Sequence, residues 1–177
     1  MTTQQQVESL LRSTDDQQIM GMIPVLAQST FYTACSGSHH HYPGGLAEHS
    51  LGVAQLLLSS SSLIETYGRT NVIIAGLFHD ICMAQHPAWN TIGINRNGHR
   101  MHGTRSVRIL GDYFHMHLDN EVFYAIKKHK QKSFIPSSDH PSHPLHAALY
   151  RADHQNAATA SLQHSHHSIL SKPNQTI

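Results

Sequence analysis

The sequence predicts an all-α protein folded as a compact single-domain helical bundle. Apolar residues recur at intervals of three and four positions along most of the 177-residue chain, which is the spacing that places them on one face of a helix. Clusters of proline, glycine and polar residues interrupt this pattern, and we find neither an internal repeat nor convincing evidence of a β-sheet. A chain of 19.7 kDa is long enough to bury a substantial core, so we expect one domain.

Two short helices are expected at the N-terminal end, over residues 4–13 and 16–29. Asp15 is the expected N-cap of the second helix, because a short carboxylate side chain can accept a hydrogen bond from an amide of the first turn. A loop of small residues, 33–38, and the segment His39–Gly45 follow, where a proline and paired glycines interrupt any regular element. The apolar positions at helical spacing in these two helices are Val7, Leu10, Leu11, Ile19, Met22, Ile23 and Leu26.

Two longer helices are expected in the middle of the chain, over Gly44–Ser60 and Thr70–Met83. The second is so strongly apolar that we expect it to be buried, and Thr70 is its expected N-cap. Residues 84–101 contain proline, glycine and asparagine, so they are expected to form a loop with a small β-hairpin around Asn95–Gly98.

Three further helices complete the expected bundle, over Thr104–His115, Asp119–Lys130 and Leu145–Ser161. The lysines at the end of the second of these suit a helix C-terminus, where the helix dipole favours cations. A loop with three prolines, 133–144, separates the last two helices. The polar, histidine-rich segment 163–177 is expected to be a frayed, flexible tail.

These elements define one expected domain over residues 1–162, with N-terminal helices in 1–30 and the functional core in 31–160. The chain has 18 His but only 12 Lys and Arg and 11 Asp and Glu, so its chemistry depends mainly on imidazole groups. A formal net charge of +1 gives no overall electrostatic reason to bind duplex nucleic acid or an anionic membrane. Two cysteines are too few for a disulfide scaffold or a cysteine-based zinc cage.

The compartment expected from these features is the cytoplasm. The longest apolar stretch, Val72–Phe78, is too short to span a bilayer, and the first residues lack the basic and apolar regions of a signal peptide. We expect no membrane partner, and the sequence does not indicate the oligomeric state.

The most informative pair of residues is His79-Asp80, which interrupts the apolar segment Ile73–Cys82. A carboxylate in apolar surroundings is costly unless it is paired or bound to a cation, and the adjacent imidazole offers a second metal ligand. Taken alone, the pair is more simply explained by hydrogen bonds with the backbone at a helix end. Two other residues favour the metal-binding interpretation.

The two residues that favour a metal site are His49 and Asp153, and each is expected on the core side of its helix. His49 follows Leu46 by about one turn, and Asp153 follows Leu149 by one turn. Together with His79-Asp80 they offer four ligands from three helices, and facing helices of a bundle commonly build metal sites in this way. Nitrogen and oxygen ligands of this kind suit zinc, manganese or iron better than calcium.

The ordered set of His, His-Asp and a distant Asp resembles the signature of the HD-domain metal-dependent phosphohydrolase superfamily. The resemblance covers about residues 31–158, and it is closest to a subgroup that includes the HD domain of 3′-5′ exoribonucleases and small uncharacterised HD hydrolases. The segments that carry it are His39–Ser50, His102–Val107, Ala125–His129 and His143–Asp153.

The resemblance implies that His49, His79, Asp80 and Asp153 hold one divalent metal. It further implies that His102 and His129 hold a second metal, with Asp80 as the bridge, so that His79, Asp80, His102 and His129 are the expected catalytic residues. The alternative is that His102 and His129 contact substrate phosphate as hydrogen-bond donors, or have no role in the site. Mn, Fe, Zn, Co and Mg all remain candidates for one or two ions.

The sequence departs from the resemblance at one position that affects the choice of substrate. Many family members carry a lysine three positions after the Asp, which would supply positive charge near a phosphate, whereas this chain has Met83. Arg105, Arg151 and Lys128 are the expected phosphate-binding residues, and the basic run at 127–132 is otherwise a solvated helix end.

We therefore expect a phosphohydrolase that cleaves a phosphoester of a nucleotide or a short oligonucleotide. The exonucleases of the subgroup carry an additional nucleic-acid-binding domain, and we expect none here, so long RNA is a less favoured substrate. The other functions left open are exonuclease activity on single strands, a di-iron oxygenase on the same scaffold, and a non-catalytic module that has lost turnover.

Overall fold

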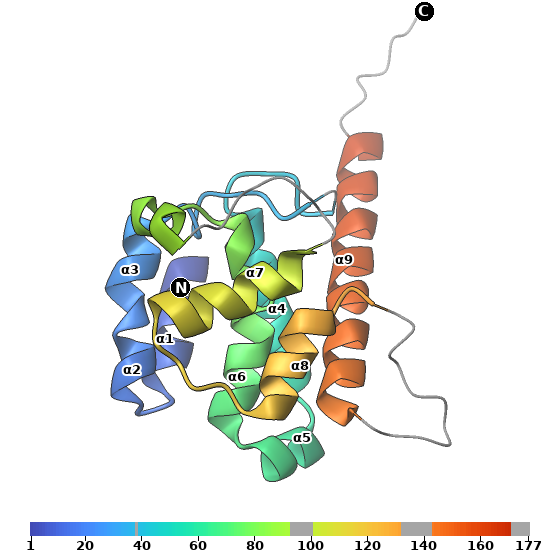
Figure 1. The fold of residues 1–177 in the computed structure, drawn as a ribbon. Coiled ribbons are helices and arrows are strands. Elements are labelled where there is room, and N and C mark those ends of the chain that lie inside the picture. Colours follow the sequence, from blue (N-terminus) through green and yellow to red (C-terminus); the bar gives the residue numbers. More distant parts are fainter. Residues whose placement is uncertain (38, 93–100, 132–142, 171–177) are drawn as a thin grey trace, which may run out of the picture.

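The structure is a computed structural model, and it describes residues 1–37, 39–92, 101–131 and 143–170. Its regular elements are helices (Figure 1). Within the described ranges, β-type pairing is confined to an isolated bridge between Ser36 and His40. The all-α prediction is therefore confirmed.

Three helices at the N-terminal end cover one side of the bundle: α1 (Thr3–Arg12), α2 (Gln17–Met20) and α3 (Met22–Gln28). The helix expected over the second and third of these is therefore interrupted. The predicted cap was also wrong, because it is the Asp16 carboxylate that accepts hydrogen bonds from backbone amides of α2. Asp15 instead takes a left-handed conformation, with φ at 53°.

The centre of the bundle is the contact between α4 (Gly45–Leu58) and α6 (Arg69–Phe78). The two helices approach closely because Gly76 has no side chain, and a Cβ at this position would overlap the backbone of Ala54. The helix that follows α4 in the chain is the short α5 (Ser61–Tyr67), which the sequence pattern does not predict, since none of its residues is fully buried and only Leu63 and Tyr67 pack partly against the core.

Helix α6 is shorter at its C-terminal end than the sequence predicts. It is preceded by Gly68, with φ at 79°, in place of the expected cap Thr70, and it ends at Phe78. The 3-10 turn η1 (Ile81–Met83) replaces the last expected turn, and the 3-10 helix η2 (Pro87–Ile92) lies in the expected loop. The early end places His79 and Asp80 at the exit of the helix, where their side chains face the centre of the bundle.

The helices that follow are α7 (His102–Arg108), the π-helix η4 (Ile109–Tyr113) and α8 (Asn120–Lys128). α7 and α8 pack against each other, and a Cβ at Gly103 would overlap the carbonyl groups of α8. Because α8 ends two residues before the predicted end, His129 lies just beyond the helix as its C-cap.

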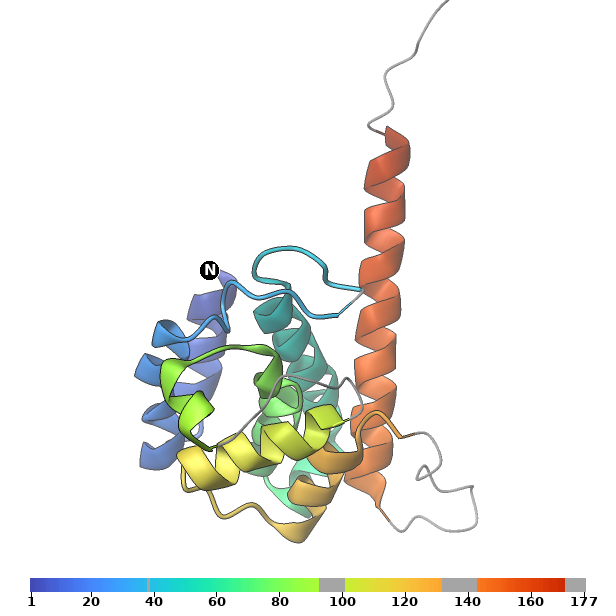
Figure 2. The same ribbon diagram turned by 45° about the horizontal axis from the view of Figure 1, so that its top comes forward.

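The last helix, α9 (Pro144–Leu170), continues past the predicted end at residue 161 and projects beyond the bundle (Figures 1 and 2). The rest of the predicted tail, 171–177, lies outside the described residues, as do the predicted hairpin at 95–98 and residues 132–142 of the predicted loop. No helix in the described part of the chain combines the length and the apolar character that a membrane span requires.

The core is filled by apolar side chains from all the larger helices. Polar and charged side chains are buried with them, mainly where the end of α6 faces α4, α8 and α9. Burial of so many ionisable groups in one place is costly unless they are paired with each other or with a cation. The buried histidines and aspartates are His40, His49, His79, Asp80, His129, His146 and Asp153.

Candidate metal centre

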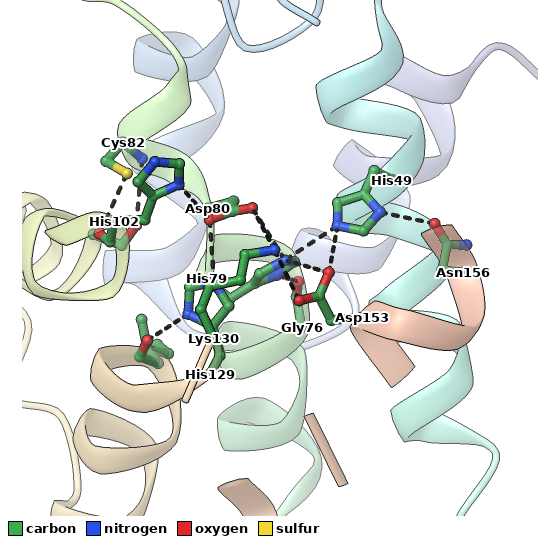
Figure 3. Close-up of polar contacts among 12 residues, drawn as sticks. His49, Gly76, His79, Asp80, Cys82, His102, His129, Lys130, Asp153 and Asn156 are labelled. Carbon is green, nitrogen blue, oxygen red and sulfur yellow. Dashed lines mark hydrogen bonds and ion pairs between the residues drawn. The ribbon is translucent and has the colours of Figure 1, made fainter. Parts of the chain in front are cut away.

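The centre is built around His79, which is completely buried at the C-terminal end of α6. Its Nδ1 lies 2.8 Å from the carbonyl oxygen of Gly76, and a carbonyl can only accept, so Nδ1 carries the proton. The Nε2 lone pair of the neutral ring is therefore turned toward the centre (Figure 3). Burial lowers the pKa of His79 to about 3, so the imidazole is in the neutral form that binds metals.

His49 on α4 is oriented by the same principle. Its Nδ1 donates to Oδ1 of Asn156 at 2.8 Å, which leaves Nε2 as the acceptor nitrogen. The Nε2 atoms of His49 and His79 then lie 3.3 Å apart with two lone pairs facing each other. Such a contact is unfavourable on its own and becomes favourable when both nitrogens bind one cation, so the observed donor set fits a metal.

Asp153 on α9 supplies a carboxylate to the same place. Its Oδ1 lies 3.1 Å from Nε2 of His49 and 4.0 Å from Nε2 of His79. Burial alone would raise the pKa of Asp153, but its polar neighbours His49, His79 and Lys130 outweigh this effect and lower it. His49, His79 and Asp153 thus form a buried group with one ligand atom each, all within 4.8 Å of one another.

Asp80 follows His79 and is 3 % exposed. Its Oδ2 lies 3.7 Å from Nε2 of His79, whereas its Oδ1 lies 3.2 Å from Nε2 of His129 and 3.6 Å from Nδ1 of His102. Burial alone would raise its pKa, but the neighbouring His129 and His79 hold it well below its usual value. One oxygen of an ionised Asp80 therefore faces His79, and the other faces His102 and His129.

His129 is presented in the same tautomer as His79. Its Nδ1 lies 2.7 Å from the carbonyl oxygen of Ile126, so Nδ1 donates, and in the neutral ring the Nε2 lone pair faces Oδ1 of Asp80. These two atoms are buried and make no hydrogen bond within the described part of the chain. Nε2 of His129 and Oδ1 of Asp80 thus form a second pair of facing atoms that could bind one cation between them.

The structure brings together all the metal ligands that the sequence predicts. His49, His79 and Asp153 could hold one ion, and His129 and His102, which both face Oδ1 of Asp80, could hold another with Asp80 shared between the two ions. Cys82 also lies beside Asp80 and His102, but burial raises the pKa of its thiol to about 11. The thiol is therefore protonated at neutral pH and is a poor metal ligand.

Sequence reasoning did not single out Lys130, which reaches into the centre (Figure 3). Its Nζ lies 2.9 Å from Oδ2 of Asp153 and 3.6 Å from Oδ2 of Asp80. The available signal was its position directly after His129, but a basic run at a helix end is ordinarily solvated.

A pocket of about 830 Å³ opens onto one side of the centre. This volume lies in the range of about 300–1,000 Å³ that is typical of small-molecule sites. The described residues that line the pocket are Cys35, Ser36, Gly37, His39, His41, Asp80, Met83, His102 and Lys130.

The predicted phosphate-binding residues do not line this pocket within the described part of the chain. Arg151 is exposed on α9, Arg105 lies within α7, and the carbonyl of Lys128 accepts a hydrogen bond from His146. Their role in substrate binding stays a prediction.

The histidine run before α4 lies beside the centre. The rings of His39 and His40 have their centroids 4.8 Å and 5.1 Å from that of His49. His40 is 3 % exposed, so it is part of the core and not a surface histidine. His39 is half-buried and lines the pocket.

Comparison with protein-family models gives one result that covers most of the chain. The model of the HD domain matches residues 46–161, which include every predicted metal ligand. Searches of curated proteins and of solved structures gave no match. The match spans well over half of the 177 residues and agrees with the all-α fold and with the order of the buried histidines and aspartates along the chain. The chain therefore belongs to the HD domain family.

Proposed function

We propose that this protein is a metal-dependent phosphohydrolase that cleaves a phosphoester of a nucleotide or a short oligonucleotide. The observation that carries the proposal is the position of Asp80, one of whose carboxylate oxygens faces His79 while the other faces His102 and His129. A carboxylate in this position can bridge two cations a few Å apart. Paired divalent metals activate water as a nucleophile and stabilise the charge on the oxygens of a phosphoryl group in the transition state.

In the proposed site, His49, His79, Asp80 and Asp153 hold the first ion, and Asp80, His102 and His129 hold the second. The protein's contribution is to fix these ligands before substrate arrives. The carbonyl groups of Gly76 and Ile126 and the amide of Asn156 hold three imidazoles in the tautomer that presents Nε2. Asp80 can also accept a proton or orient the attacking water, because it faces the pocket.

Two features of the pocket support a small substrate. Its volume of about 830 Å³ accommodates a mononucleotide or a dinucleotide, and its described lining combines imidazole groups with an ammonium group that can donate to phosphate oxygens. The formal net charge of the whole chain is +1, which gives little long-range attraction for a polyanion.

The experiment that tests the proposal is metal analysis of the purified protein, followed by a panel of nucleotides, dinucleotides and model phosphodiesters. Each substrate is tested with Mn²⁺, Mg²⁺, Fe²⁺, Co²⁺ and Zn²⁺ after removal of bound metal. We expect release of phosphate or of a nucleotide with at least one of these ions and none without metal. Oxygen consumption by the iron-loaded protein, without hydrolysis of any phosphoester, would contradict the proposal and favour an oxygenase.

A further inference from the structure

Lys130 occupies an unusual position for a residue of a basic surface run. It follows His129 directly, and its ammonium group contacts one oxygen of Asp153 at 2.9 Å and one of Asp80 at 3.6 Å. These carboxylates belong to different parts of the fold, one on α9 and the other at the exit of α6. The lysine thus joins the two acids that bracket the centre (Figure 3).

The same carboxylates belong to the proposed ligand set. Oδ2 of Asp80 lies 3.7 Å from Nε2 of His79 and 3.6 Å from Nζ of Lys130, so the imidazole and the ammonium group approach the same oxygen. A divalent ion bound to Asp80, Asp153 and His79 would repel an ammonium group at these distances. Metal binding and the two Lys130 ion pairs therefore oppose each other.

The side chain of Lys130 is 41 % exposed, whereas those of Asp80 and Asp153 are 5 % and 2 % exposed. The lysine can therefore leave the acids by rotating its flexible stem, whereas the acids are fixed in the core. The pocket that it also lines offers the space for this movement. A lysine displaced from the carboxylates stays next to the centre with its three donor hydrogens free to meet an anion.

Met83 lines the same pocket. The thioether of Met83 carries no charge, so the ammonium group among the described residues that line the pocket comes from Lys130.

We propose that Lys130 is a switchable cation of this site: it pairs with Asp80 and Asp153, a divalent metal displaces it, and the displaced ammonium group binds the phosphate of the substrate. The metal competition is independent of the reaction catalysed. The phosphate contact rests on the proposed function.

The competition is tested by calorimetric titration of metal-free protein with Mn²⁺. Lys130→Met removes the competing charge, so we expect it to bind the ion about tenfold more tightly than the parent. Lys127→Met is the matched control, because it removes the same charge from a lysine that packs 5.1 Å above the ring of Phe123. An unchanged or weaker affinity in Lys130→Met would overturn the competition.

The phosphate contact is tested by titrating the Mn²⁺-loaded proteins with inorganic phosphate. We expect Lys130→Met to lose about tenfold in phosphate affinity, whereas Lys130→Arg and Lys127→Met keep the affinity of the parent. Equal phosphate affinity in Lys130→Met and the parent would overturn this part of the proposal. Lys130→Gln replaces Lys130→Met in both titrations if the methionine variant does not fold.

The two proposals can fail separately. If both titrations give the expected shifts but no phosphoester is hydrolysed, the assignment of Lys130 holds and the proposed function is wrong. If phosphoesters are hydrolysed but neither titration separates Lys130→Met from Lys127→Met, the function holds and the assignment of Lys130 is wrong.

Discussion

Oδ1 of Asp80 lies 3.2 Å from Nε2 of His129, and the donor hydrogen of His129 is directed away from it, to the carbonyl oxygen of Ile126. In the neutral form of His129, two hydrogen-bond acceptors therefore face each other in the core. The Nε2 atoms of His49 and His79 repeat this arrangement at 3.3 Å. Each pair is unfavourable alone and is explained if a cation binds between the two atoms, so the backbone carbonyls that fix the tautomers are part of the proposed metal site.

The first prediction concerns Asp80, which is expected to contact every bound ion. Asp80→Asn keeps the shape of the side chain but removes its charge, so we predict that tight metal binding is lost. Calorimetric titration with Mn²⁺ measures this. Metal at about 100 times its dissociation constant should also stabilise the parent against unfolding by about 2.7 kcal/mol, and this gain should disappear in the variant.

Asp112→Asn is the matched control, because Asp112, in η4, forms an exposed ion pair with Arg108, the last residue of α7. It should keep the affinity and the stabilisation of the parent. Tight Mn²⁺ binding by a folded Asp80→Asn protein would show that the ion binds elsewhere.

The second prediction concerns the number of ions. His102→Ala and His129→Ala each remove a ligand of the proposed second ion only, so metal content should fall from about two to about one per chain. His154→Ala, which changes an exposed histidine of α9, should leave the content unchanged. One ion in the parent and in both variants would assign His102 and His129 to contacts with substrate instead.

The third prediction concerns Asn156, which positions His49 without reaching the centre. Asn156→Leu removes the acceptor of the His49 Nδ1 hydrogen, so the imidazole is free to rotate and Mn²⁺ affinity should fall roughly 10- to 100-fold. Asn156→Asp keeps an acceptor and should retain most of the affinity, as should Gln155→Leu on the exposed side of the same turn. Equal losses in the leucine and aspartate variants would argue against a role in orienting the ring.

The fourth prediction concerns the packing of α7 on α8. A Cβ at Gly103 would overlap the carbonyl oxygens of Ile126 and Lys127, so Gly103→Ala should lower the free energy of unfolding by roughly 1–3 kcal/mol in urea titrations. Gly111→Ala is the control, because nothing lies within 4 Å of the added methyl group there. A stability loss that is the same in both variants would show that helix packing is not the cause.

The sequence predicts those elements whose stability depends on a buried apolar face. The helices that form α4, α6 and α8 are of this kind, because their apolar positions lie in the core. α5 has no fully buried residue, and only Leu63 and Tyr67 of this helix pack partly against the core. The hydrophobic pattern of this short helix is therefore too weak to predict it.

The site shows the same limit. His49 and Asp153 could be placed near His79 because helical spacing directs them to the core and long-range packing then brings the helices together. Lys130 could not, because it lies beyond the end of α8 and its long side chain turns back toward two acids that are distant in sequence. The helical spacing of apolar residues does not predict where a long side chain outside a helix will lie.

The central claim is that the cluster around Asp80 is a metal-dependent hydrolytic centre. The most direct test is the initial rate at which Mn²⁺-loaded protein cleaves the best phosphoester of the substrate panel, measured for the parent, Asp80→Asn and Asp112→Asn under identical conditions. The account predicts that the parent and Asp112→Asn are equally active and that Asp80→Asn, although folded, shows no activity above background. Equal rates in all three proteins would contradict it.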